Sequence, residues 1–151
     1  MEKALWGRIT WYLFHTIAEK IKQEYFVIAK ATLILFIRQI CANLPCPVCA
    51  QHAKDHLSKV NFELIQTKDH LKQFVFAFHN RVNMDLEKPT ASIDILSKYE
   101  SANFDKILDM FIKIHHNESY SNKFMMKKHY RNEGIKNFVN WYSTNKYMFL
   151  S

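Results

Sequence analysis

The 151-residue sequence has the length of one typical domain, and hydrophobic residues make up 48% of it, enough for a single core. It holds only 2 Gly and 3 Pro, whereas all-β and doubly wound α/β folds need many turns of the kind that Gly permits. The composition therefore favours an all-α fold. The formal net charge of +7 raises nucleic acid as a partner, but Lys and Arg are spread along the chain without a dense basic run, so we expect no nucleic-acid partner.

Apolar residues at three-to-four spacing predict a series of amphipathic helices. Pro45 is expected to end the second helix, Pro47 to occupy the favourable first position of the third, and Thr67 to cap the fourth. We expect residues 1–100 to form a four-helix bundle, residues 101–151 to form a C-terminal helical extension, and residues 116–123 to form a polar loop. The expected helices cover about residues 3–22, 25–42, 46–57, 67–88, 92–115 and 134–147.

Neither an export signal nor a membrane span is expected. The first eight residues carry charge and lack the apolar centre of a signal peptide. The most apolar stretch, residues 29–44, is interrupted by Lys30 and Arg38 and is short for a bilayer. We therefore expect a soluble, cytoplasmic protein with no membrane partner.

Two of the three cysteines form the segment Cys46-Pro47-Val48-Cys49 at a predicted helix start. Free backbone N–H groups and the helix dipole at that position stabilise a thiolate, the reactive form of the side chain. Two sulfurs at this spacing can also close an exchangeable disulfide. In a reducing compartment, a C-x-x-C segment indicates redox chemistry or metal binding more often than a stabilising structural disulfide. Cys41 lies in an apolar run and is interpreted as a buried structural thiol.

Zinc is the main alternative for the cysteine pair, because His52 and His56 follow within two helical turns. Four ligands on one helix are unlike the usual zinc sites, which bring separate segments together. Inert core cysteines are the second alternative. Redox chemistry is favoured over both, and we expect no metal site.

Two further segments carry polar or charged side chains on helix faces that are otherwise expected to be apolar and buried. Arg8, Trp11 and His15 share one helix face, as do His79 and Asn83 on a later helix. A cation, an indole and an imidazole in a row would suit a planar anionic ligand, and buried polar groups need partners that a cofactor would supply. Each motif alone is more often structural, but together with the C-x-x-C segment they indicate one site.

The three segments together resemble the Erv/ALR family of FAD-dependent sulfhydryl oxidases. The family pattern Gly-Arg-x-x-Trp-x-x-x-His-x-x-Ala begins here at Gly7, Pro-Cys-x-x-Cys begins at Pro45, and His-Asn-x-Val-Asn-x-x-Leu-x-Lys-Pro begins at His79. Order and spacing agree over about residues 5–90. The resemblance implies a four-helix bundle that holds FAD and forms a homodimer.

The resemblance also implies roles for individual residues. Cys49 would lie next to the flavin ring, and Cys46 would exchange with the substrate. Protein thiols would give two electrons to this pair, and FAD would pass them to oxygen, yielding hydrogen peroxide. The residues implied to hold FAD are Gly7, Arg8, Trp11, His15, Cys49, His52, His79, Asn80, Val82, Asn83, Lys88 and Tyr99.

The departures from the family pattern are also informative. Phe76 and Ile93 stand where cellular members carry a second cysteine pair, and the chain has no further C-x-x-C segment. This short form resembles the enzymes of large cytoplasmic DNA viruses, which implies a location in the host cytoplasm or virion. It also implies a thioredoxin-like relay protein as a thiol donor. A non-enzymatic virion protein that binds zinc or nucleic acid is the alternative function.

Overall fold

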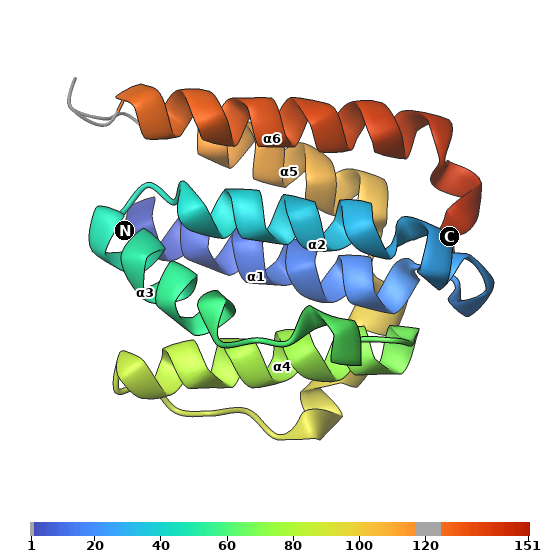
Figure 1. The fold of residues 1–151 in the computed structure, drawn as a ribbon, viewed down its shortest axis with the longest axis horizontal. Helices are drawn as coiled ribbons and strands as arrows, with labels where there is room; N and C mark the ends of the chain where they lie inside the picture. Colours follow the sequence, from blue (N-terminus) through green and yellow to red (C-terminus); the bar gives the residue numbers. More distant parts are fainter. Residues whose placement is uncertain (1, 117–124) are drawn as a thin grey trace.

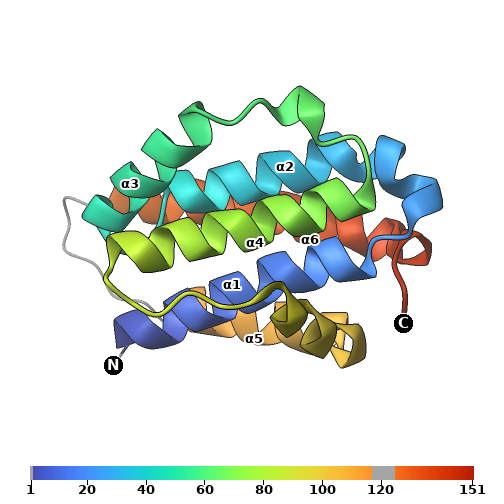
Figure 2. The same cartoon turned by 90° about the horizontal axis from the view of Figure 1, so that it is seen from below.

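The helices of the protein lie at three stacked levels (Figure 1), and they pack most closely between levels. The computed structural model describes the backbone of residues 2–116 and 125–151, and the side chains of residues 5–116 and 128–151. In Figure 1 the layer of α5 and α6 lies above the layer of α1 and α2, which lies above α3 and α4; Figure 2 shows the stack from below. The helices are α1 (Glu2–Lys20), α2 (Phe26–Ala42), α3 (Pro47–Ser58), α4 (Lys68–Asp85), α5 (Phe104–His116) and α6 (Met125–Thr144).

Aromatic side chains join the upper and middle layers into one core. Phe36 of α2 stacks on Phe138 of α6 at 4.2 Å between ring centroids, and meets Phe111 of α5 at 6.1 Å and Phe14 of α1 at 6.4 Å. All four rings are almost completely buried. The packing of such large apolar rings supplies much of the stabilisation of a small domain. The hydrophobic cluster therefore includes residues from both sides of residue 100, and the division of the chain there stays a prediction.

The all-α expectation is confirmed, and the first four helices begin and end within three residues of the expected positions. Pro47 is the first residue of α3, after Cys46 as its N-cap. The Thr67 side chain caps α4 by accepting a hydrogen bond from the N–H of His70 at 3.1 Å. These local signals set the helix boundaries as the sequence predicted.

The prediction of one helix over residues 92–115 is wrong. The chain forms a 3₁₀ helix, η3 (Ile93–Ser101), then turns extended at Ala102 before α5 begins. The side chain of Asn103 accepts a hydrogen bond from the N–H of Lys106 at 3.1 Å and so caps α5. An Asn side chain at a cap competes with continuation of a helix through the same point. Tyr99 is buried at the end of η3.

The start of the last helix was also predicted wrongly. α6 begins at Met125, well before Gly134, which lies in mid-helix. A Cβ at Gly134 would lie 3.2 Å from Oε1 and 3.3 Å from Cβ of Gln39 in α2. The glycine therefore permits a close approach of α6 to α2 and does not end a loop. The loop expected over residues 116–123 lies, except for residue 116, outside the described residues.

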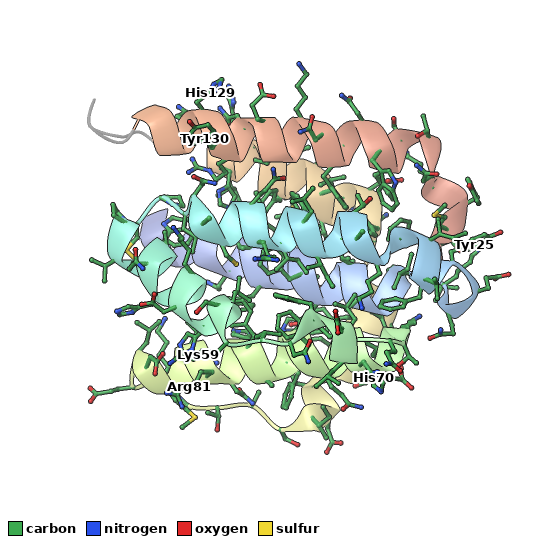
Figure 3. All side chains as sticks on the ribbon, viewed as in Figure 1. Tyr25, Lys59, His70, Arg81, His129 and Tyr130 are labelled. Carbon is green, nitrogen blue, oxygen red and sulfur yellow. A yellow bond between two sulfur atoms is a disulfide. The ribbon has the colours of Figure 1, made fainter. Side chains whose placement is uncertain are left out.

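The C-terminal segment is anchored to the end of α1. Ile21 and Phe149 form an isolated antiparallel bridge, in which the N–H of Lys22 donates to the carbonyl of Met148 at 2.8 Å. Tyr25 lies beside this end of the molecule (Figure 3) and packs edge-on against Tyr147, with ring centroids 5.3 Å apart. The last residues thus hold the upper layer to the middle layer at the end opposite the start of α3.

The segment Gln23–Ala42 is long and apolar enough to cross a membrane by length and composition, with a mean hydropathy of 1.6. It extends beyond the apolar stretch noted in the sequence. Within the protein its helix α2 lies between α3 and α6 and buries eight side chains, among them Leu33, Phe36 and Ile37. Burial in the core accounts for only part of this composition, since 44% of the most apolar window is buried. The absence of a membrane partner stays a prediction.

Candidate active site

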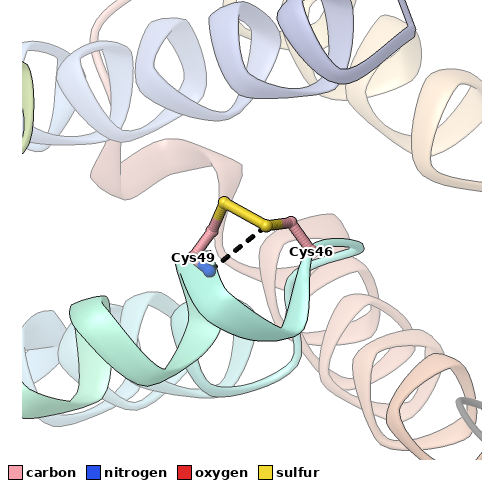
Figure 4. Close-up of a disulfide and its surroundings, with 2 residues drawn as sticks. All are labelled: Cys46 and Cys49. Atoms are coloured by element: carbon pink, nitrogen blue, oxygen red, sulfur yellow. Dashed lines mark hydrogen bonds between the residues drawn. A yellow bond between two sulfur atoms is a disulfide. The ribbon is translucent and has the colours of Figure 1, made fainter. Parts of the chain in front are cut away.

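Cys46 and Cys49 form a disulfide at the first turn of α3, with their Cα atoms 5.1 Å apart (Figure 4). Cys46 is the N-cap residue, and its sulfur accepts a hydrogen bond from the backbone N–H of Cys49 at 3.2 Å. Both residues are only partly buried. After reduction, the same N–H and the positive end of the helix dipole would stabilise a thiolate on Cys46. The pair therefore suits thiol–disulfide exchange.

The disulfide lies at one end of the bundle. Figures 1 and 2 show that the start of α3 lies at the end where α1 begins and where α2 and α4 finish. Arg8 is in the first half of α1, and Asn83 is in the last turn of α4, whereas Trp11 is at the middle of α1. The fold thus places Arg8 and Asn83 toward the end of the bundle that carries the disulfide, and Trp11 farther along it.

Four rings from three elements form what we call the ring stack: Trp11 and His15 of α1, His79 of α4 and Tyr99 of η3. Trp11 stacks on His79 at 4.2 Å and an interplanar angle of 8°. Nε2 of His15 lies 3.0 Å from Nδ1 of His79, within hydrogen-bond distance. Tyr99 stacks on His15 at 4.6 Å and 13°. The structure thus brings together four residues that the sequence assigned to one site.

Burial keeps both imidazoles of the ring stack neutral. It lowers the pKa of His15 to about 3, with smaller contributions from His79 and from the positive charge of Lys98. It lowers the pKa of His79 to about 4, again with help from Lys98 and Lys88. Burial also raises the pKa of Tyr99 to about 12. At neutral pH the stack is therefore a row of uncharged, hydrogen-bonding rings, with one imidazole donating to the other.

Asn80 fastens the loop between α4 and η3. Its side-chain amide donates to the carbonyl of Ala91 and accepts from the N–H of Ala91, each at 2.9 Å. In the same loop, the N–H of Lys88 donates to the carbonyl of Asn83 at 2.8 Å, and Glu87 adopts a positive φ of 57°. The Asn80 amide, which the resemblance assigned to FAD, is thus engaged with the protein backbone and fixes the loop that carries Lys88.

The remaining candidate residues lie around the two groups described above. Arg8, His52 and Lys88 are exposed, and their side chains make no hydrogen bond or ion pair with other described residues. A Cβ at Gly7 would meet nothing within 4 Å. The partly buried candidates are Val82 and Asn83. Exposed cations without a protein partner are available to an anionic ligand such as a phosphate.

Within the described residues, no three His, Cys, Asp or Glu side chains are grouped so that they would hold a metal ion. The two cysteines of the proposed zinc set are joined to each other. His56, the fourth member of that set, is paired with Asp85 of α4 at 2.6 Å. The described part of the chain therefore offers zinc no ready-made site.

The part of the chain that contains the site is also the part that matches a known protein family. The profile of the Erv1 / Alr family matches residues 8–105, about two thirds of the chain. The chain belongs to the Erv1/Alr family. The matched region runs from α1 to the start of α5 and contains the disulfide and the ring stack, whereas most of α5 and all of α6 lie outside it.

Viral proteins are among the relatives of this Erv1/Alr chain. It is 32% identical over 87 residues to the FAD-linked sulfhydryl oxidase of African swine fever virus, and this match covers 58% of the chain and 72% of the viral protein. It is 31% identical over 90 residues to protein 096R of Invertebrate iridescent virus 3, covering 59% of the chain and 61% of that protein. The chain thus spans less than two thirds of the length of 096R. No solved structure shows a significant match.

Sequence reasoning missed the contact that holds the far end of α3 to α4. Nε2 of His56 in α3 lies 2.6 Å from Oδ2 of Asp85 in α4, and this hydrogen bond lowers the pKa of the Asp85 carboxyl. His56 had been considered only as a zinc ligand. Its helical spacing from Cys49 placed it on α3, but nothing in the sequence identified Asp85 as its partner.

Proposed function

We propose that the chain is an FAD-linked sulfhydryl oxidase that forms disulfides in protein substrates. The observation that carries this proposal is the partly buried Cys46–Cys49 disulfide at a helix start, in a chain of the Erv1/Alr family. The African swine fever virus relative that bears the name FAD-linked sulfhydryl oxidase supports it.

The chain's own part in the reaction is thiol–disulfide exchange. A substrate thiolate attacks the sulfur of Cys46, forming a mixed disulfide and releasing the thiolate of Cys49. The second substrate thiolate then attacks the substrate sulfur of that mixed disulfide and displaces the Cys46 thiolate. The substrate leaves with one disulfide and has lost two electrons, while Cys46 and Cys49 are reduced. The start of α3 favours both thiolates through the helix dipole, and the N–H of Cys49 stabilises the Cys46 thiolate that the second displacement produces.

The residues of the site fit FAD. The ring stack offers flat, uncharged and hydrogen-bonding groups of the kind that an isoalloxazine ring requires, and two of its members, Trp11 and His79, remain partly accessible. Arg8, His52 and Lys88 supply cationic or hydrogen-bonding groups for the pyrophosphate. When bound, FAD would accept the two electrons of the dithiol and give them to oxygen, producing hydrogen peroxide.

Electrons must reach Cys46 directly from an external thiol. The chain contains three cysteines, and the third, Cys41, is buried in α2 with its pKa raised by burial. A buried neutral thiol is a poor shuttle because the thiolate is the reactive form. We therefore infer that the donor is a folded protein with its own accessible dithiol, such as a thioredoxin-like relay protein, or the final substrate itself.

Two further parts of the proposal concern assembly and location. Val27, Ile28 and Leu35 are exposed on one side of α2, and covering them with a second copy of the chain would remove apolar surface from water. This supports a homodimer. The viral relatives and the reduced state in which cytosolic thiols are kept support a location in the host cytoplasm or virion, where such an enzyme would be needed.

Oxygen uptake with a dithiol substrate tests the function. We expect the purified chain to be yellow and to consume oxygen when dithiothreitol is added. Cys46→Ser and Cys49→Ser should each abolish this uptake, whereas Cys41→Ser, the matched control, should retain it. Full activity of Cys49→Ser would refute the scheme. A colourless protein carrying zinc, or one whose main activity is salt-dependent binding to nucleic acid, would favour the alternative functions.

A further inference from the structure

A buried cation from the C-terminal extension reaches the turn that precedes the redox motif. Arg131 of α6 has no exposed surface, and its Nη1 donates a hydrogen bond to the backbone carbonyl of Asn43 at 2.7 Å. Asn43 is the C-cap residue of α2 and lies three positions before Cys46. The last turn of α2 carries no basic residue of its own. Arg131 therefore supplies from another layer the positive group that the carbonyl end of a helix favours.

The close packing of α6 on α2 makes this contact possible. Gly134 follows Arg131 by three positions, so both lie on the same face of α6. The absence of a side chain at Gly134 leaves room for Gln39, one turn before Asn43. The Asn43 side chain in turn donates to the carbonyl of Gln39 at 2.8 Å. The end of α2 is thus held from within by Asn43 and from α6 by Arg131.

A neutral histidine continues this contact toward α1. Thr10 donates its hydroxyl to the carbonyl of Trp6 at 2.6 Å, which leaves its oxygen to accept from Nε2 of His115 at 2.8 Å. Burial, and next the positive charge of Arg131, lower the pKa of His115 to about 3. Arg131 is therefore a buried positive charge that acts on the His115–Thr10 pair between α5 and α1 and is hydrogen-bonded to the end of α2.

We propose that Arg131 is a positioning residue for the Cys46–Cys49 disulfide. By holding the Asn43 carbonyl, it fixes the turn through which α2 leads into α3 and so fixes the first turn of α3, which carries both sulfurs. The far end of α3 is held separately, by His56 and Asp85. The α5–α6 extension, outside the region that matches the family, thus determines how well the redox motif is ordered. This inference rests on the proposed function only in taking the disulfide as redox-active.

Loss of Arg131 should slow exchange at the disulfide. In Arg131→Met, the Asn43 carbonyl loses a charge-assisted hydrogen bond, and the turn before Cys46 gains freedom. We expect the rate constant for reduction of Cys46–Cys49 by dithiothreitol to fall by more than twofold, and the loss of one such bond sets an upper limit of about tenfold.

The experiment follows reduction of the disulfide in the full-length chain by acid quenching and alkylation under anaerobic conditions. Arg131→Lys, which retains the charge and one donor, should restore the rate to within about twofold of the wild type. Tyr142→Phe is the matched control: it removes a 2.8 Å hydrogen bond to Asp105 elsewhere on α6 and should leave the rate unchanged. All variants are compared at equal helical content by circular dichroism.

A wild-type rate in folded Arg131→Met, or an equal fall in Tyr142→Phe, would overturn the proposal. If Arg131→Met does not fold, Gly134→Val takes its place: its Cβ would lie 3.3 Å from Cβ of Gln39, and its two methyl groups add crowding between α6 and α2 while the charge of Arg131 is kept. A rate within twofold of the wild type would overturn the proposal equally. Failure of the proposed function would appear differently, as a wild-type chain without thiol-dependent oxygen uptake, because the exchange test needs neither flavin nor oxygen.

Discussion

Three buried histidines should make the protein sensitive to mild acid. The pKa values of His15 and His115 are lowered to about 3, and that of His79 to about 4, in each case mainly by burial. In the unfolded chain each would titrate near its ordinary value of about 6.5. Between pH 6.5 and these low values, the unfolded state binds more protons than the folded state. The stabilisation is therefore complete above pH 6.5 and is lost progressively as the pH falls.

The size of the effect follows from the two most buried groups. Each proton bound only by the unfolded state changes the free energy of unfolding by about 1.4 kcal/mol per pH unit. Between pH 6.5 and pH 5, His15 and His115 therefore each remove about 2 kcal/mol of stability. His79, which is more accessible, adds a smaller loss in the same direction. A typical domain has only about 5–15 kcal/mol to lose, so a cooperative loss of helix is expected not far below pH 5.

Glutamine variants isolate this contribution. His15→Gln and His115→Gln each retain a side-chain amide that can donate toward His79 or Thr10, but they do not titrate. Urea unfolding followed by circular dichroism at pH 8, 7, 6 and 5 gives the free energy of unfolding. Values at pH 8 measure the structural cost of each substitution, and the fall from there to pH 5 should be about 2 kcal/mol smaller than in the wild type. Parallel curves for wild type and both variants would refute the reasoning.

Three other changes test separate parts of the structure. Trp11→Ala removes the 4.2 Å stack on His79, and we expect the purified variant to lose flavin absorbance on gel filtration while keeping its helical signal. Phe36→Ala removes the ring that joins four helices and should lower the free energy of unfolding by about 3–5 kcal/mol in urea titration. Asn80→Ala breaks both hydrogen bonds to Ala91; limited proteolysis should then cut the loop faster, with a stability loss of about 1–2 kcal/mol.

The features that the sequence predicted well depend on neighbours along the chain. Pro45, Pro47 and Thr67 act within one helical turn, and each marked a real helix boundary. The position of Cys46 as an N-cap followed from the same local rule. Helix periodicity also placed Trp11 and His15 on one face, and the structure places both in the ring stack. Such features need no knowledge of which helix packs against which.

The features that the sequence did not predict depend on contacts between distant segments. Gly134 looked like a helix boundary, and only the proximity of Gln39 shows why a glycine lies in mid-helix. Arg131 lay outside every expected helix, although it is fully buried in α6 and bonded to the end of α2. In each case the residue type was visible, but its partner lay on another element.

The arrangement reconciles two requirements of a redox disulfide. Exchange requires that an incoming thiolate reach a sulfur along the S–S axis, so the sulfurs must be accessible. Cys46 and Cys49 meet this requirement because both residues are only partly buried. Electron transfer to a bound group requires that the same sulfurs stay in a fixed position. The protein meets both by restraining α3 outside the disulfide: Arg131 holds the turn before its start, and Asp85 holds its last turn through His56. Order is thus imposed on the helix while the sulfurs themselves remain free to exchange.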